Sequence, residues 1–334
     1  MTKINMPDYD IVVGHHEMDK IESYVKDFYH FDQVFILTDD HVFALYEEKI
    51  QSWFNTFDVK VCVIPHGETS KSYQVYLSAI EDLIKQGIKR QHLLIALGGG
   101  VVGDLAGFIA STLYRGVPFM QIPTSLLAMV DSSIGGKVGI DLDLGKNLIG
   151  SFYQPKKVII DPMFLSTLPL EEYQNGMAEM IKSGLIGDKD LYHYFMDHRT
   201  VTEKEIIQTI QVKRNVVLID PYDKKERMFL NFGHSYGHAI EKKTAYKKYK
   251  HGQAISYGML IALQKGISLN ITPSYLYEEV KQILLKNSLV KEPLLEAIDF
   301  EDELKYDKKN MADGFHFILI ENVGKAVIKK IKIG

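Results

Sequence analysis

The segment that decides the fold is Leu93-Leu94-Ile95-Ala96-Leu97-Gly98-Gly99-Gly100-Val101-Val102-Gly103-Asp104. An apolar run of strand length leads into the pattern G-x-G-x-x-G, and a helical pattern follows. Glycines at such a turn allow backbone N–H groups to approach a diphosphate at the amino terminus of a helix. Four glycines within six residues exceed the one or two that a tight turn needs. The segment therefore predicts a strand, a phosphate-binding turn and a helix.

The acidic residue that usually follows this turn by about 20 positions is missing. Gln121-Ile122-Pro123-Thr124 occupies that region, so the dinucleotide-binding pattern is incomplete. A second loop, Pro65 to Lys71, also leaves a strand for a helix. It offers a carboxylate for ribose hydroxyls and an ammonium group, although by itself it would be an ordinary helix start.

Short apolar runs alternate with helical patterns through the first half of the chain. Strands are predicted at 34–37, 59–64, 93–97, 117–122 and 158–160. Apolar residues at i, i+3, i+4 and i+7 predict a helix over 73–86, with Ser70 as its N-cap and Gly87 at its end. Such alternation predicts an α/β, Rossmann-like domain over residues 1–162 with a mostly parallel sheet.

The strand pattern fades after residue 162, and helices are predicted at 203–219, 234–245, 252–265 and 275–287. The second half, 163–334, is therefore predicted to be an all-α type, mostly helical domain that binds metal and substrate. Two β-type runs, 314–320 and 325–333, flank the glycine-bearing turn Asn322-Val323-Gly324. They predict a small hairpin at the carboxyl end of this domain.

Charge and composition exclude several classes of function. The 334 residues include 39 basic and 43 acidic side chains, a net charge of -4, so no broad positive field favours nucleic acid. The single cysteine, Cys62, cannot close an intrachain disulfide and is predicted to be buried in a strand. The chain shows neither a leader-like start nor an apolar run of about 18 residues, so we expect a cytoplasmic protein without a membrane partner.

A cluster of polar residues lies among glycines and apolar residues between 123 and 147. Asp131, Lys137, Lys146 and Asn147 belong to it, and the lysines adjoin Gly135-Gly136 and Gly145. Lysines beside exposed backbone suit an anionic ligand. This cluster therefore predicts an anion-binding site.

The second half holds three histidines within 18 residues, His234, His238 and His251. With a glutamate they make a credible zinc site, but spacing alone leaves the ligands open. His234 and His238 have the spacing of the metalloprotease pair, yet Ser235 stands where that pattern needs glutamate. Upstream, Glu179 and Lys182 are spaced i, i+3, which by itself indicates a surface ion pair.

Five segments, in order along the chain, resemble the 3-dehydroquinate synthase family of sugar phosphate cyclases: 98–104, 131–137, 145–150, 179–182 and 231–238. The resemblance spans about residues 33–320. It implies a lyase that converts 3-deoxy-D-arabino-heptulosonate 7-phosphate to 3-dehydroquinate and phosphate, in the shikimate pathway of aromatic amino acid biosynthesis. It further implies NAD, Zn²⁺ for which Co²⁺ can substitute, and a homodimer.

The resemblance also assigns residues, position by position. It implies Glu179, His234 and His251 as metal ligands, which leaves His238 to face substrate. It implies contacts to NAD from Asp39, Glu68, Lys71, Gly99, Gly100, Val101, Asp104, Thr124, Ser125, Lys146 and Thr167. The anionic substrate would meet Asp131, Arg115, Lys137, Asn147, Lys182, Lys213, Arg227, Asn231 and either Lys308 or Lys309. Gln253 departs from the pattern, which usually has glutamate there, so the outer coordination of the metal stays open.

Three other functions compete with this interpretation. A metal-dependent polyol dehydrogenase of the glycerol type shares the glycine turn and the histidines, but its neutral substrate gives no reason for five or more cations to gather. A sister cyclase would make an aminocyclitol precursor from a hexose phosphate. A non-catalytic nucleotide-binding module would leave the histidines without a purpose.

Overall fold

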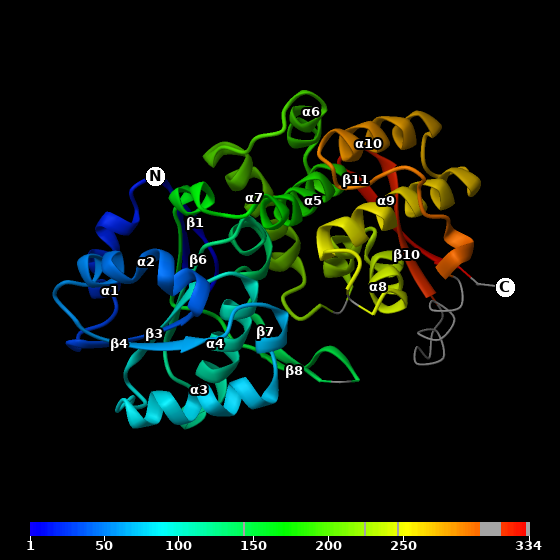
Figure 1. The fold of residues 1–334 in the computed structure, drawn as a ribbon. Helices are drawn as coiled ribbons and strands as arrows, with labels where there is room; N and C mark the ends of the chain where they lie inside the picture. Colours follow the sequence, from blue (N-terminus) through cyan, green and yellow to red (C-terminus); the bar gives the residue numbers. More distant parts are fainter. Residues whose placement is uncertain (143, 224, 246, 301–314, 332–334) are drawn as a thin grey trace. The chain divides into compact units, whose positions relative to one another are not determined.

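A computed structural model describes residues 1–334 except 143, 224, 246, 301–314 and 332–334. The chain forms two compact units, Met1–Leu168 and Pro169–Gly334 (Figure 1). The predicted boundary was residue 162. The segment just after it stays with the first unit because Asp161 accepts hydrogen bonds from the N–H groups of Glu17 and Met18, and Thr167 bonds the hydroxyl of Tyr46.

The first unit is built on a seven-stranded sheet with the order β1-β2-β9-β6-β5-β3-β4. The strands are β1 (Thr2–Asn5), β2 (Asp10–Val13), β3 (Gln33–Asp39), β4 (Asp58–Ile64), β5 (Leu93–Gly98), β6 (Phe119–Pro123) and β9 (Lys157–Ile160). All neighbours pair in parallel except β1 with β2. The strands predicted from apolar runs are confirmed. The runs in β3, β5, β6 and β9 are apolar because these strands are almost wholly buried.

Helices connect these strands: α1 (Ile21–Lys26), α2 (Asp40–Trp53), α3 (Tyr73–Lys85) and α4 (Gly100–Thr112). From β3 the chain passes through α2 to β4 on one side, whereas β5, β6 and β9 lie on the other side of β3. The strand order therefore reverses between β3 and β5. In open parallel sheets, ligands bind outside the carboxyl ends of the strands at such a switch point.

The glycines after β5 have a packing cause as well as a functional one. A Cβ atom at Gly98 would lie 2.6 Å from Val102, and one at Gly103 would lie 2.7 Å from the Gln121 side chain on β6. These two glycines let α4 pack closely on the sheet. Gly99 and Gly100 are less crowded, since their nearest neighbours are Ser125 and Ser132 at 3.4 and 3.1 Å. They form the start of the helix.

Two details of the first unit differ from the sequence prediction. The N-cap of α3 is Ser72, which accepts from the N–H of Val75, rather than Ser70, which lies in a 3-10 turn (Glu68–Ser70). The polar cluster also folds into a separate antiparallel hairpin, β7 (Lys137–Leu142) with β8 (Gly145–Phe152). Gly87 ends α3 as predicted, with a left-handed φ of 96°. Cys62 is buried, also as predicted.

The second unit is helical, as predicted. Its helices are α5 (Leu170–Gly187), α6 (Lys189–Asp197), α7 (Glu203–Ile219), α8 (His234–Lys243), α9 (His251–Ser268) and α10 (Ser274–Lys286). The predicted terminal hairpin is present as β10 (Phe315–Asn322) paired with β11 (Lys325–Ile331). Buried apolar residues of α5, α9 and α10 form much of its core. Within the described part of the chain, none of the helices is long and apolar enough to cross a bilayer.

Candidate active site

Helix α5 presents a buried ion pair. Glu179 and Lys182 are each 2% exposed, and the Lys182 ammonium donates to the Glu179 carboxylate. Their spacing had indicated a surface pair, and that interpretation is wrong. The whole segment from Asn175 to Ile186 is buried in the helical unit, so both charges are removed from water. Such a pair is costly to bury unless further polar partners complete it.

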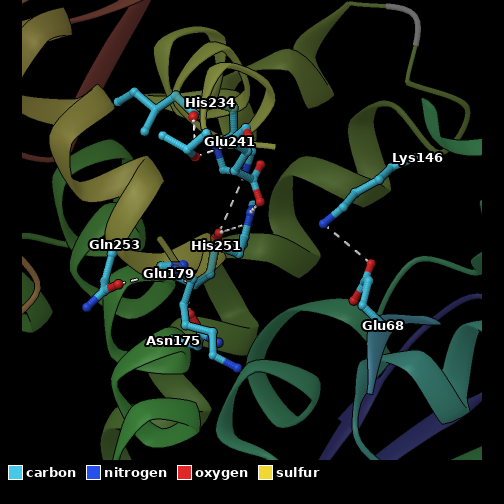
Figure 2. A network of polar contacts seen from close by, with 12 residues as sticks. Glu68, Lys146, Asn175, Glu179, His234, Glu241, His251 and Gln253 are labelled. Atoms are coloured by element: carbon cyan, nitrogen blue, oxygen red, sulfur yellow. Dashed lines mark hydrogen bonds and ion pairs between the residues drawn. The ribbon is translucent and has the colours of Figure 1, made fainter. Parts of the chain in front are cut away.

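Two histidines complete the surroundings of Glu179 (Figure 2). His234 begins α8 and His251 begins α9, and their Nε2 atoms lie 3.5 and 3.4 Å from Glu179 Oε1. One donor atom from each residue lies within 4.8 Å of the others. The structure therefore brings donor atoms of all three predicted metal ligands together, and each ligand comes from a different helix.

Close contact between α8 and α9 places the two histidines together. Gly233 precedes His234 with a left-handed φ of 79°, a conformation that glycine adopts without strain. A Cβ atom at Gly258 would lie 2.0 Å from the Gly233 carbonyl oxygen and 2.8 Å from the Gly237 nitrogen. Only a residue without a side chain allows these backbones to approach so closely.

The second nitrogen of each histidine ring faces an oxygen atom. His234 Nδ1 lies 3.3 Å from the Phe232 carbonyl, and His251 Nδ1 lies 3.5 Å from Glu241 Oε1. An oxygen at Nδ1 favours a proton on that nitrogen, which leaves Nε2, the nitrogen nearest Glu179, as the atom that can bind a metal ion. Both rings are thus oriented as metal-binding histidines usually are.

The electrostatics of the cluster keep Glu179 ionised. Burial alone would raise the pKa of Glu179, but Lys182 and the two histidines hold it well below its usual value. Burial and the nearby Lys182 charge hold the pKa of His234 well below its usual value, so this ring is neutral. Burial opposes protonation of His251 too, but its contacts with Glu179 and Glu241 raise its pKa to about 9.

The chemistry of these donors fits a divalent metal ion. Zinc and cobalt accept a carboxylate and two imidazole nitrogens as ligands, and metal binding would displace the proton from His251. Catalytic zinc sites keep three protein ligands and one open position. His238 lies beside the cluster, with its ring centroid 5.4 Å from that of His234 and 6.4 Å from that of His251. Its ring is exposed, and it is outside the group of donors that converge on one point.

Residues predicted to contact NAD gather at one edge of the sheet in the first unit. All but Lys146, which lies on β8, stand at or after the carboxyl ends of parallel strands: Asp39 ends β3, Glu68 and Lys71 follow β4, Gly99, Gly100, Val101 and Asp104 follow β5, Thr124 and Ser125 follow β6, and Thr167 follows β9. Gly99 is the N-cap residue of α4, beside the switch point, and as a glycine it makes no side-chain bond to the first N–H groups of the helix. Such a helix end suits a diphosphate.

Polar contacts bind several of these loops to one another. Lys71, only 6% exposed, donates to Asp104 at 2.5 Å and to the side chain of Asn147. Lys146 lies 3.5 Å from Glu68 (Figure 2). Asn147 adopts a φ of 57°, and its N–H donates to Asp141 at 2.7 Å. The hairpin β7–β8 is thereby joined to the loop after β4.

The remaining residues predicted to meet the substrate lie in both units. In the first unit, Asp131 lies in a short helical turn, Lys137 begins β7 and Arg115 follows α4 with a φ of 62°. In the second, Lys213 on α7 and Arg227 are buried, and Asn231 is exposed three residues before His234. The Arg227 guanidinium donates to the Pro221 carbonyl at 2.9 Å. Lys308 and Lys309 lie outside the described residues.

Sequence reasoning missed three residues that contact the predicted site residues or the backbone beside them: Asp141, Asn175 and Glu241. Asn175 accepts from the N–H of Gly252, next to His251, at 2.8 Å. A signal for Glu241 was available, because residues 234, 238 and 241 share one face of a helix at i, i+4 and i+7.

The parallel sheet with its glycine turn and the convergent Glu-His-His group place the chain in the class of NAD- and metal-dependent sugar phosphate cyclases. Family models for the N-terminal and C-terminal parts of 3-dehydroquinate synthase match residues 61–175 and 176–310. The chain belongs to the 3-dehydroquinate synthase family.

Individual relatives agree with this membership. A 3-dehydroquinate synthase of Clostridium botulinum is 40% identical over 97% of this chain and 95% of its own. One of Streptococcus mutans is 40% identical over 99% and 96%. Among solved structures, a 2-deoxy-scyllo-inosose synthase complexed with carbaglucose-6-phosphate, NAD⁺ and Co²⁺ is 27% identical, covers 98% of this chain and 93% of its own, and has a TM-score of 0.85.

Proposed function

We propose that this protein is a lyase that converts 3-deoxy-D-arabino-heptulosonate 7-phosphate to 3-dehydroquinate and phosphate. The observation that carries the proposal is the convergence of Glu179, His234 and His251 on one point in a member of the 3-dehydroquinate synthase family. The reaction belongs to the shikimate pathway of aromatic amino acid biosynthesis.

Two bound groups supply chemistry that side chains lack. Bound NAD would supply reversible hydride transfer, and a divalent ion such as Zn²⁺ or Co²⁺ would make a bound alcohol easier to deprotonate. Glu179, His234 and His251 would hold the ion. Asp39, Lys71, Asp104 and the open end of α4 would hold NAD, and their common position at one sheet edge supports this assignment.

The chain's cations bind a substrate that carries both a carboxylate and a phosphate. We assign this task to Lys137 and Arg115 of the first unit, with Asn147 and Asp131, and to Lys182, Lys213 and Arg227 of the second unit, with Asn231. A hydrogen bond to a charged group contributes about 1.5–3 kcal/mol, so several such contacts discriminate strongly against neutral sugars. Lys182 and Arg227 are already buried, which removes competing water from their surroundings.

His238 handles a proton during ring opening in this proposal. Its exposed ring lies next to the two ligand rings, so it reaches substrate bound at the metal without being part of the coordination. The substrate phosphate itself can accept the proton of the elimination step. Little further acid-base chemistry is then required of the protein.

One experiment separates this function from its competitors. The heptulosonate phosphate is supplied with catalytic NAD and metal, and inorganic phosphate is followed beside nicotinamide absorbance. Phosphate release without a lasting absorbance change is expected. Sustained NAD reduction with a polyol would indicate a dehydrogenase instead, and turnover of a hexose phosphate without a carboxylate would indicate a sister cyclase.

We further propose that the protein acts in the cytoplasm as a homodimer on a small anionic sugar phosphate. The family resemblance supports both statements. Light scattering coupled to size-exclusion chromatography tests the dimer, because a mass near 38.1 kDa would show a monomer.

A further inference from the structure

Two side chains outside the ligand group hold the start of α9, where His251 lies (Figure 2). Asn175 comes from α5, and its Oδ1 accepts the N–H of Gly252 at 2.8 Å. Glu241 comes from α8, and its Oε1 lies 3.5 Å from His251 Nδ1. One residue thus contacts the backbone beside His251, and the other contacts its ring.

Asn175 joins two of the three helices that carry ligands. It lies four residues before Glu179 on α5, on the same helix face. A Cβ atom at Gly252 would lie 2.7 Å from the Asn175 Cα, so the two helices are in backbone contact at this point. The separation between Glu179 and His251 therefore depends on a contact that Asn175 makes.

Asn175 is itself held in place. Its Nδ2 donates to Glu172 Oε2 at 2.9 Å, and Glu172 Oε1 receives the Lys250 ammonium at 3.1 Å. Lys250 immediately precedes His251, so Glu172 and Asn175 together contact the residues on both sides of it. The amide of Asn175, 6% exposed, has a fixed orientation.

Gln253 contacts the backbone just before His251. Its Oε1 accepts the N–H of Lys250 at 3.2 Å and so caps α9. Glu241, which is 3% exposed, instead supplies the carboxylate beside His251. The carboxylate beside His251 Nδ1 therefore comes from α8.

We propose that Asn175 and Glu241 are positioning residues of the metal centre. Asn175 fixes the backbone at the start of α9, and Glu241 orients the His251 imidazole so that its Nε2 faces Glu179. This inference rests on the proposed function, because it deepens the account of the same metal site. Loss of such outer contacts typically weakens metal binding 10–100-fold.

The test measures Co²⁺ binding by the metal-free, full-length protein. Wild type, Asn175→Ala and Glu241→Gln are titrated with Co²⁺ while its visible absorption is recorded, and affinities are obtained by competition with a chelator. We expect each variant to bind about 10–100-fold more weakly and the Glu241→Gln spectrum to shift. Glu241→Gln is nearly isosteric, so it preserves the test if Asn175→Ala does not fold.

Asn287→Ala is the matched control. Asn287 is also a buried asparagine of the second unit, and its Nδ2 donates to the Ile283 carbonyl at 2.9 Å, at the end of α10. Its loss should lower thermal stability but leave Co²⁺ affinity and absorption unchanged. If wild type binds Co²⁺ and both test variants bind it with the same affinity, the positioning roles of Asn175 and Glu241 are overturned while the proposed function stands. A wild type that takes up no Co²⁺ overturns the proposed function with it.

Discussion

The Nζ atom of Lys71 lies 2.5 Å from Oδ2 of Asp104, and this contact joins the loop after β4 to the helix that follows the glycine turn. Burial alone would lower the pKa of Lys71, but Asp104 and the acidic groups Glu68 and Asp141 raise it above its usual value. The lysine is therefore fully charged, and it holds two loops of the predicted NAD site in one arrangement.

Lys71→Met should weaken NAD binding at least tenfold, because the variant removes a cation and frees the loop that it fixes. It should also lower the free energy of unfolding by about 1–3 kcal/mol. Calorimetric titration with NAD and denaturant unfolding measure the two effects. Lys157→Met is the matched control, since Lys157 is another buried lysine, paired with Asp27 at 2.8 Å. It should lose stability but keep NAD affinity.

His238→Ala should retain metal while losing turnover. Its ring lies beside the ligand rings without joining the converging donors, so its removal leaves the coordination intact. We expect one metal per chain by atomic absorption and a fall in kcat of about 100-fold or more. His234→Ala is the comparison variant and should lose the metal. Loss of stoichiometric metal from His238→Ala would refute the ligand assignment.

Gly258→Ala should separate α8 from α9. The new Cβ would meet the Gly233 backbone at 2.0 Å, and backbone cannot rotate away. We expect a loss of about 1–3 kcal/mol or more in unfolding free energy, with weaker metal binding. Gly266→Ala on the same helix meets the Thr272 side chain instead and should leave metal affinity unchanged. Equal metal affinity in both variants would show that this backbone contact does not position the histidines.

The thiol of Cys62 should be unreactive in the folded protein. Burial, followed by the nearby Asp82, raises its pKa from 9.0 to about 12. A raised thiol pKa means less thiolate, so at pH 8 the reactive fraction falls by about a thousandfold. Ellman's reagent should label one thiol per chain quickly in urea and very slowly without it. Rapid labelling of the folded chain would contradict the burial of Cys62, which is 2% exposed.

Sequence patterns predicted those strands and helices whose apolar pattern matches their burial in the fold. The runs of β3 and β5 are apolar at nearly every position because helices cover both faces of a parallel sheet. β1 and β2 were missed because each has four residues, and Thr2-Lys3-Ile4-Asn5 shows only one buried apolar side chain. The hairpin β7–β8 was missed because its glycines and lysines are typical of a loop.

The site was predictable by residue type but not by geometry. Spacing indicated histidine coordination yet could not choose among His234, His238 and His251, because the choice depends on how α5 meets α8 and α9. Only the family resemblance singled out Glu179. Asn175 carries no local signal of its function, since a buried asparagine is common. Glu241 shares a helix face with His234 and His238, but this spacing alone does not show that its carboxylate lies beside His251.

The residues predicted for cofactor binding follow five separate strands, while the strands themselves are held together by backbone pairing and apolar packing. A mutation at the tip of one loop therefore leaves the frame beneath it intact. Residues of these loops can therefore change while the paired strands that position them stay the same.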